Sequence, residues 1–95
     1  MRGGWTYIMT NKPCGVLYVG VTSRLHARIE QHKRGKGSEF CRRYNLHTLV
    51  LAERHERIED AIAREKAMKA WKREWKIRLI EEQNPEWRDL FSLLA

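Results

Sequence analysis

The fold of this chain is decided by three consecutive stretches near its start: Trp5-Thr6-Tyr7-Ile8-Met9-Thr10, Asn11-Lys12-Pro13-Cys14-Gly15, and Val16-Leu17-Tyr18-Val19-Gly20-Val21. The two outer stretches are rich in aromatic and β-branched residues, which is typical of strands. The middle stretch has the Asn, Pro and Gly that favour turns. We therefore predict an antiparallel hairpin. A loop over residues 11–14 would place Tyr7 directly opposite Tyr18, with both phenols on one face of the sheet.

Residues 22–52 predict one helix, one short basic segment and a third strand. Thr22 or Ser23 is expected to cap a helix over residues 24–34, whose inner side carries Leu25 and Ile29. A basic, glycine-containing loop then leads to a short segment over residues 40–44 and a strand over residues 48–52. These elements predict the α+β class.

The C-terminal part of the chain is expected to be helical. Apolar residues recur at helical spacing over residues 59–83, and Trp71 and Trp75 are expected in the core. Two helices with a bend near Ala70 are favoured, because one unbroken helix of ~37 Å would overshoot so small a domain. Asn84-Pro85 ends the helical region.

Length and composition limit the class of protein. A chain of 95 residues predicts one domain, placed here over residues 5–90. No run approaches the ~18 apolar residues of a membrane helix, and no secretory signal follows the first residues. The two cysteines, Cys14 and Cys41, do not form a disulfide scaffold, so we expect a reduced, cytoplasmic protein without a membrane partner.

The positive charge lies in the first half of the chain. Residues 1–48 hold nine Lys and Arg against two acids, whereas residues 49–95 hold ten of each, so the whole net charge of +7 comes from the first half. Such a one-sided basic surface favours binding to a polyanion, because Lys and Arg release counterions from its phosphates. Nucleic acid is therefore the favoured partner, and solubility alone is the alternative.

Five polar residues stand out because their positions suggest more than packing. Glu65 shares a helix face with Ile62 and Met68, although pairing with Lys69 at i+4 would also explain it. Arg28 and His32 share another helix face. Either Arg28 binds a phosphate and His32 handles a proton beside it, or both belong to the solvated flank of an amphipathic helix. The two tyrosines of the hairpin are either cross-strand packing or site residues.

Together these residue types are suited to phosphodiester cleavage. A divalent cation on one carboxylate polarises the phosphate, and arginine neutralises charge that grows in the transition state. A tyrosine in a positive field, or a histidine, can handle the proton of the attacking water. The four histidines show no His-x3-His spacing and the cysteines no Cys-x2-Cys spacing, which does not favour structural zinc.

Over roughly residues 5–90 the sequence resembles the GIY-YIG nuclease superfamily, in particular its short stand-alone bacterial members. Tyr18-Val19-Gly20 matches the second signature element, and Arg28 and His32 follow Gly20 by eight and twelve residues. Glu65, on a later helix, is similar to the metal-binding glutamate of the family. The first signature element reads Trp5-Thr6-Tyr7 instead of Gly-Ile-Tyr, which keeps the tyrosine and changes the two residues before it.

The resemblance implies a three-stranded antiparallel sheet flanked by helices, and a role for each matching residue. Glu65 would bind one Mg²⁺ or Mn²⁺. Tyr7 would activate the attacking water, directly or through a neighbour, with Tyr18 positioning the water or the phosphate. Arg28 would hold the scissile phosphate, and His32 would carry a proton or contact the phosphate. Structural support would come from two further residues, Gly20 and Asn84.

Three functions follow as hypotheses. The first is a metal-dependent DNA endonuclease of low sequence specificity, with structure-selective cleavage in DNA repair or processing as an option. This hypothesis leaves open whether the substrate is single-stranded, branched or duplex DNA, and whether a homodimer or a partner protein is involved. The second is a non-catalytic binding module, in which phosphates lie along Lys33, Arg34, Lys36, Arg42 and Arg43, and bases stack on Phe40 or Tyr44. The third is an interaction module that uses exposed tryptophans, with Trp5 and Trp87 as candidates.

Overall fold

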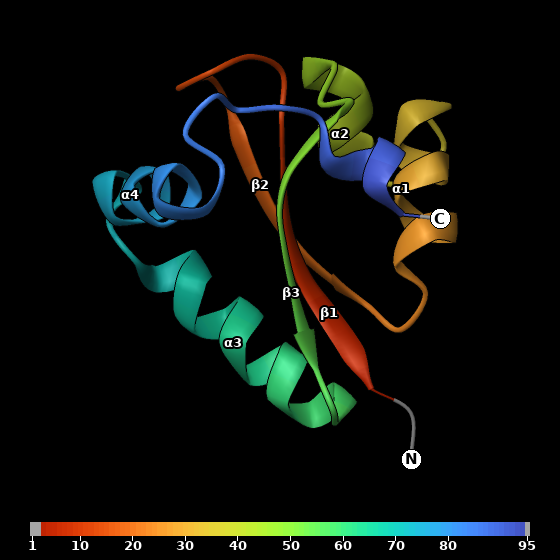
Figure 1. Cartoon of the computed structure of the whole chain (residues 1–95). Coiled ribbons are helices and arrows are strands. Elements are labelled where there is room, and N and C mark those ends of the chain that lie inside the picture. Colours follow the sequence, from red (N-terminus) through yellow and green to blue (C-terminus); the bar gives the residue numbers. More distant parts are fainter. Residues whose placement is uncertain (1–2, 95) are drawn as a thin grey trace.

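A central antiparallel sheet organises the chain. The computed structural model describes residues 3–94, and its strands are β1 (Gly4–Thr10), β2 (Leu17–Thr22) and β3 (Thr48–His55). They pair in the order β2-β1-β3, so β1 is central and β2 is an edge strand (Figure 1). The predicted α+β class and the three-stranded sheet are confirmed.

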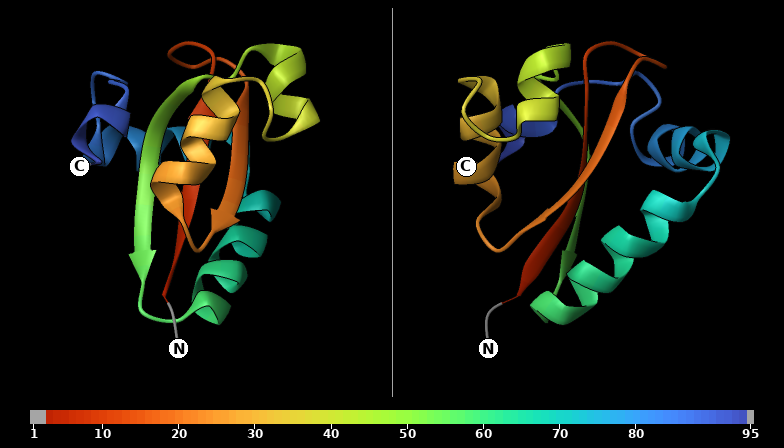
Figure 2. Two further views of the ribbon diagram at one scale, coloured as in Figure 1. Left: turned by 90° about the vertical axis from the view of Figure 1, so that its right-hand side faces the viewer. Right: turned by 180° about the vertical axis from the view of Figure 1, so that it is seen from behind.

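Helices cover both faces of this sheet. On one face lie α1 (Leu25–Lys33), α2 (Glu39–Tyr44) and the 3-10 helix η1 (Leu90–Leu93), and on the other lie α3 (Ile58–Ala70) and α4 (Arg73–Gln83) (Figure 2). The expected bend near Ala70 is confirmed, because Trp71 and Lys72 have extended backbone between α3 and α4. The chain therefore builds two helical layers with the sheet between them.

Each layer buries its own apolar cluster. The cluster under α1 contains residues of β1, α1, α2, the connection after α2, and β3, namely Tyr7, Met9, Leu25, Ile29, Cys41, Leu46 and Leu49. The cluster under α3 and α4 contains Ile8, Val19, Val50, Leu51, Met68, Ile80 and Trp87. Because successive strand residues point to opposite faces, Tyr7 and Ile8 enter different clusters. Tyr7 thus lies on the face that α1 covers.

The predicted hairpin register is wrong by two residues. Tyr7 pairs with Gly20 and Met9 pairs with Tyr18, so the loop covers residues 11–16. The side chains of the loop fix this length: the Thr10 hydroxyl lies 2.7 Å from the Val16 carbonyl oxygen, and the Val16 amide donates to Asn11 Oδ1 at 2.9 Å. A shift of two keeps the side-chain face, so both phenols still share one face, as diagonal neighbours.

Other local predictions also need correction. The residue before α1 is Arg24 rather than Thr22 or Ser23, and the Thr22 hydroxyl instead accepts a hydrogen bond from the Arg24 amide at 3.1 Å. Trp75 is 48% exposed rather than in the core, because the change of direction after Ala70 puts it on a different helix from Met68. Trp87 is only 7% exposed, which removes it as an exposed contact residue.

Cys14 is exposed, Cys41 is buried, and both are free thiols. Within residues 3–94, no helix combines the length and the apolar composition needed to cross a membrane.

Candidate active site

A hydrogen bond between β1 and α1 forms the centre of the site. The Tyr7 hydroxyl lies 2.8 Å from Nε2 of His32, and both side chains are buried. The Tyr18 ring on β2 lies 6.3 Å from the Tyr7 ring and 5.6 Å from the imidazole, measured between centroids. The first three elements of the chain therefore bring two phenols and one imidazole together.

Gly20 makes this approach of the rings possible. It pairs with Tyr7 across the β1–β2 ladder, so its missing side chain leaves space directly beside the phenol. A Cβ atom at this position would lie 2.5 Å from both Cζ and the hydroxyl oxygen of Tyr7, and 2.9 Å from Cε2 of Tyr18. Real Cβ atoms do not approach other atoms so closely, so any other residue would displace a site tyrosine.

Arg28 lies one helical turn before His32 on the same face of α1. The neighbouring Tyr7 hydroxyl raises the pKa of Arg28, and Tyr18 contributes in the same direction. The guanidinium donates from Nη1 to Gln31 Oε1 at 3.2 Å. The side chain is half-buried, so one part of the guanidinium reaches the tyrosines while solvent reaches another.

Both proton-handling groups are neutral at pH 7, and burial moves the pKa of each further from 7. Burial raises the pKa of Tyr7 to about 12, and the neighbouring Arg28 offsets only part of this rise. Burial, together with the positive charge of Arg28, lowers the pKa of His32 to about 4. In the free protein the phenol therefore keeps its proton, contrary to the idea that the positive field would release it, and the imidazole has a free lone pair.

The loop after α1 presses on the other nitrogen of the imidazole. A Cβ atom on Gly37 would lie 2.6 Å from Nδ1 of His32. In the described part of the chain this buried Nδ1 atom has no hydrogen-bond partner. The loop thus fixes the ring in place by close packing, and Nε2 faces Tyr7.

Glu65 belongs to the other layer of the molecule. It lies on α3, its side chain is 14% exposed, and its Oε2 forms an ion pair with Nζ of Lys69 at 2.8 Å. The i+4 pairing that the sequence left open is therefore present. Lys69 in turn lines an open hollow along edge strand β2, together with Tyr18 and Phe40. The hollow connects the α3 layer with the face that carries the tyrosines.

The five basic residues expected at the phosphates occupy α1, the loop after it and α2. Lys36 is exposed, Arg34 and Arg42 form exposed ion pairs with Glu30 and Glu39 at 3.4 Å, and the Arg43 guanidinium lies 5.9 Å from the Tyr44 ring. Exposed pairs of this kind contribute little and exchange readily for a phosphate.

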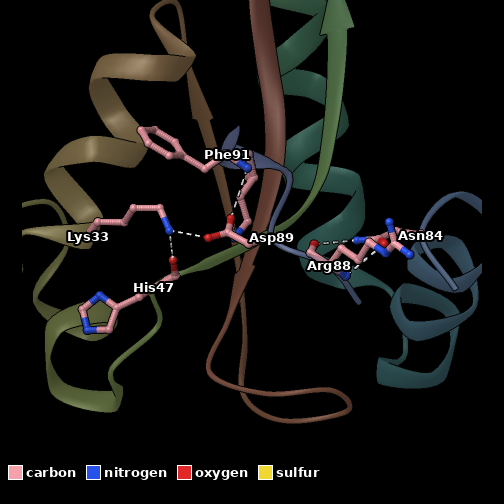
Figure 3. A network of polar contacts seen from close by, with 7 residues as sticks. Lys33, His47, Asn84, Arg88, Asp89 and Phe91 are labelled. Carbon is pink, nitrogen blue, oxygen red and sulfur yellow. Dashed lines mark hydrogen bonds and ion pairs between the residues drawn. The ribbon is translucent and has the colours of Figure 1, made fainter. Parts of the chain in front are cut away.

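Lys33 and Asn84 have structural contacts that Figure 3 shows. The ammonium of Lys33 pairs with Asp89 and donates to the His47 carbonyl oxygen at 2.8 Å, so it is the least available of the five cations. The amide of Asn84 donates to the carbonyl oxygens of Val50 and Arg88, at 3.2 and 2.9 Å. Asn84 thereby holds the end of α4 against β3, away from the tyrosine cluster.

Sequence reasoning missed the two lysines of the hollow. Lys69 and Lys76 both line it with Tyr18, although the second half of the chain carries no net charge. The signal was present in the run from Lys69 to Arg78, which holds five basic residues and one acid. Averaging the charge over residues 49–95 concealed it.

Comparison with known proteins now identifies the family. A family model described as the GIY-YIG catalytic domain matches residues 3–78, which include Tyr7, Tyr18, Arg28, His32 and Glu65. The chain belongs to the GIY-YIG nuclease family. The resemblance seen in the sequence is thereby confirmed, and the three-stranded sheet with flanking helices agrees with it.

The relatives are small bacterial proteins. UPF0213 proteins of Staphylococcus aureus, among them those of strains Mu3, Mu50 and COL, are 36% identical to this chain over 69 residues. The match covers 73% of this chain and 84% of each relative. Among solved structures, none matches the chain significantly.

Proposed function

We propose that this chain is a metal-dependent endonuclease that hydrolyses DNA phosphodiester bonds with low sequence specificity, in DNA repair or processing. The observation that carries the proposal is the buried hydrogen bond between Tyr7 and His32, with Arg28 beside it. A neutral phenol, a neutral imidazole and a fixed guanidinium supply the groups that phosphodiester hydrolysis needs. Membership in a nuclease family supports the same reaction.

Arg28 is proposed to bind the scissile phosphate. Its guanidinium is permanently charged, it lies beside Tyr7, and its hydrogen bond to Gln31 Oε1 orients it before substrate arrives. A preorganised guanidinium stabilises the negative charge that develops on the phosphate oxygens in the transition state. The solvent-facing part of the side chain is where the phosphate would enter.

Tyr7 is proposed to activate the attacking water by means of His32. A phenol with a pKa of about 12 cannot accept a proton while it keeps its own. The neutral imidazole offers a route, because its Nε2 lies at hydrogen-bonding distance from the Tyr7 hydroxyl. In a concerted relay, the Tyr7 oxygen takes a proton from the water that attacks phosphorus as its own proton passes to Nε2, so no free phenolate forms. Tyr18 would position that water or the phosphate.

Glu65 is the proposed metal ligand. Mg²⁺ and Mn²⁺ prefer oxygen donors, and Mg²⁺ is often held by one or two carboxylates together with waters and substrate phosphates. A single half-buried carboxylate fits this mode, and residues 3–94 contain no cluster of three metal-binding side chains that would compete for the ion. A bound divalent ion would polarise the phosphate and stabilise the leaving oxygen. Metal binding at Glu65 requires that Lys69 gives up its ion pair.

The size of the domain supports low sequence specificity. The longest dimension is 34 Å, which is about one turn of B-DNA. Reading a long sequence takes roughly 1,000–2,500 Å² of protein surface. A second copy or a partner protein would extend the contact. We also propose a cytoplasmic location, which the free thiols of Cys14 and Cys41 support.

One observation favours the alternative of a binding module without turnover. The carboxylate of Glu65 is held by Lys69, and a permanent ion pair would leave no ligand for a metal. Such a module would bind DNA in a salt-dependent way in the presence of a chelator and would cut no strand.

The deciding experiment is cleavage of supercoiled plasmid and branched DNA with Mg²⁺ or Mn²⁺. We expect the wild-type chain to cut, and both Glu65→Ala and Arg28→Ala to lower the rate by at least about 100-fold. Glu74→Ala and Arg78→Ala, which change exposed residues of α4, are the matched controls. No cleavage by wild type under any condition, or equal cleavage by all five proteins, would contradict the proposal.

A further inference from the structure

A row of aromatic rings leads outward from the candidate site. The ring of Tyr18 stacks on that of Phe40, with 6.0 Å between centroids and 29° between planes, and the Phe40 ring lies 4.9 Å from that of Tyr44. We name these three residues the aromatic ladder. At its inner end Tyr18 contacts His32, so the ladder begins at the reacting groups and ends on the outer side of α2.

The outer two rings are not needed for the core. Phe40 and Tyr44 are each 43% exposed, whereas Cys41 is the residue of α2 that is buried. Leaving aromatic surface in water costs free energy, and two adjacent exposed rings form an apolar spot that other molecules can cover.

Positive charge surrounds the ladder. The Arg43 guanidinium lies 5.9 Å from the Tyr44 ring. On the other side, the hollow that Tyr18 and Phe40 line, with a volume of about 280 Å³, is also lined by Lys69 and Lys76. Aromatic faces bordered by cations are the combination that proteins use to hold single-stranded nucleic acid.

We propose that the aromatic ladder binds unpaired nucleotides next to the scissile phosphate, so that the substrate is DNA with an unpaired strand at the cut. Bases stack on Phe40 and Tyr44, while Arg43, Lys69 and Lys76 contact the phosphates. Only an unpaired base offers a free face for stacking, because bases in a duplex stack on one another. This inference rests on the proposed function, since it takes the Tyr7–His32 pair as the cutting point.

Another exposed aromatic group has a more mixed charge pattern. Arg64 lies 4.9 Å from the Trp71 ring and Lys72 lies 5.9 Å from the Trp75 ring, but Arg64 is paired with Glu53. The hollow that the two tryptophans line at the α3–α4 junction is also lined by Arg78 and Glu82, so cation and anion face the same space. Trp75, which is 48% exposed, therefore provides a matched control for loss of an exposed ring.

The test is binding without cleavage, in EDTA, with three fluorescent DNAs of one sequence: a single strand, a blunt duplex and a duplex with a single-stranded flap. We expect wild type to bind the single strand and the flap about tenfold more tightly than the duplex. Phe40→Ala and Tyr44→Ala should each weaken binding of the unpaired DNAs by about tenfold, with little effect on the duplex. Phe40→Trp should restore binding, and Trp75→Ala should leave it unchanged.

Salt titration separates stacking from charge. The slope of the logarithm of the binding constant against the logarithm of the salt concentration should be unchanged in Phe40→Ala. In Arg43→Ala the magnitude of this slope should fall by about one. Equal affinity of wild type for all three DNAs, or an equal loss in Trp75→Ala, would overturn the ladder. Thermal unfolding of each variant verifies that it is folded.

The outcomes for the ladder and for the nuclease are distinguishable. If wild type cuts plasmid DNA with metal but shows no preference for unpaired strands, the ladder fails and the proposed nuclease stands. If the preference is present and depends on Phe40, but no DNA is cut, the ladder stands as a binding surface and the proposed nuclease fails.

Discussion

The hydroxyl of Tyr7 on the central strand lies 2.8 Å from Nε2 of His32 on α1, and both side chains are buried. Buried polar pairs of this kind are costly to break, since removal of one partner leaves the other without a hydrogen bond. The pair lies beside a guanidinium and belongs to a nuclease family domain, so its chemistry can be tested directly.

Removing the phenol oxygen tests the proton route. In Tyr7→Phe the ring still fills its space, but the water loses its proton acceptor, so we expect the cleavage rate to fall by about 100-fold or more. The unpaired His32 nitrogen should also lower the free energy of unfolding by roughly 1–3 kcal/mol. Single-turnover cleavage and urea unfolding measure the two effects. Tyr44→Phe is the control, and equal rates in both variants would contradict the role of Tyr7.

The buried imidazole predicts how stability depends on pH. Its pKa is about 4 in the folded chain and near 6.5 when unfolded, so the unfolded state binds more protons between these values. Stability should therefore be fully present above pH 6.5 and be lost as the pH falls toward 4. His32→Gln, which cannot titrate, should show a flatter profile in this window. An identical pH profile of the two proteins in urea unfolding would contradict the shift.

Gly20→Ala tests the close approach of the two tyrosines. The new Cβ atom would lie 2.5 Å from the Tyr7 hydroxyl oxygen, so the phenol must move away from His32. We expect a loss of about 1–3 kcal/mol in stability, as in other overpacked cores, and at least a tenfold slower cleavage. The control is Val21→Ala, which shortens the side chain of the next residue of β2. Wild-type cleavage by Gly20→Ala would show that the tyrosine position is not critical.

Lys69 sets the availability of Glu65 for a metal ion. Its ammonium is paired with the carboxylate, so Lys69→Gln should raise the affinity for Mn²⁺ several-fold. This gain corresponds to about 1 kcal/mol, the energy of one neighbouring unit charge in water. Calorimetric titration with Mn²⁺ measures this without substrate. Lys66→Gln, on the same helix, should have little effect, and Glu65→Gln should abolish binding. Unchanged affinity in Lys69→Gln would exclude competition between the ammonium and the metal.

Local sequence patterns were sufficient for most elements of the fold, although α2 was expected only as a short basic segment and β3 only as far as Ala52. Aromatic and β-branched residues predicted β1 and β2, and helical spacing predicted α1, α3 and α4. The bend after Ala70 followed from the size of the domain, and the spacing of Arg28 and His32 from Gly20 pointed to the family. All of these depend on residues close together in the chain, or on a fixed order of residues along it.

Contacts between distant residues were decided only by the tertiary structure. The hairpin register depends on how the Thr10 and Asn11 side chains close the loop, and one loop sequence permits several lengths. The partner of Lys33 was also decided by the tertiary structure. The sequence predicted that Lys33 contacts phosphates, whereas in the structure it pairs with Asp89, which is 56 residues away in the chain. Burial likewise set the charge states of Tyr7 and His32, because desolvation depends on every group packed around a side chain. Sequence by itself determined which residues are present and on which elements they lie, whereas only the folded chain decided which of them meet.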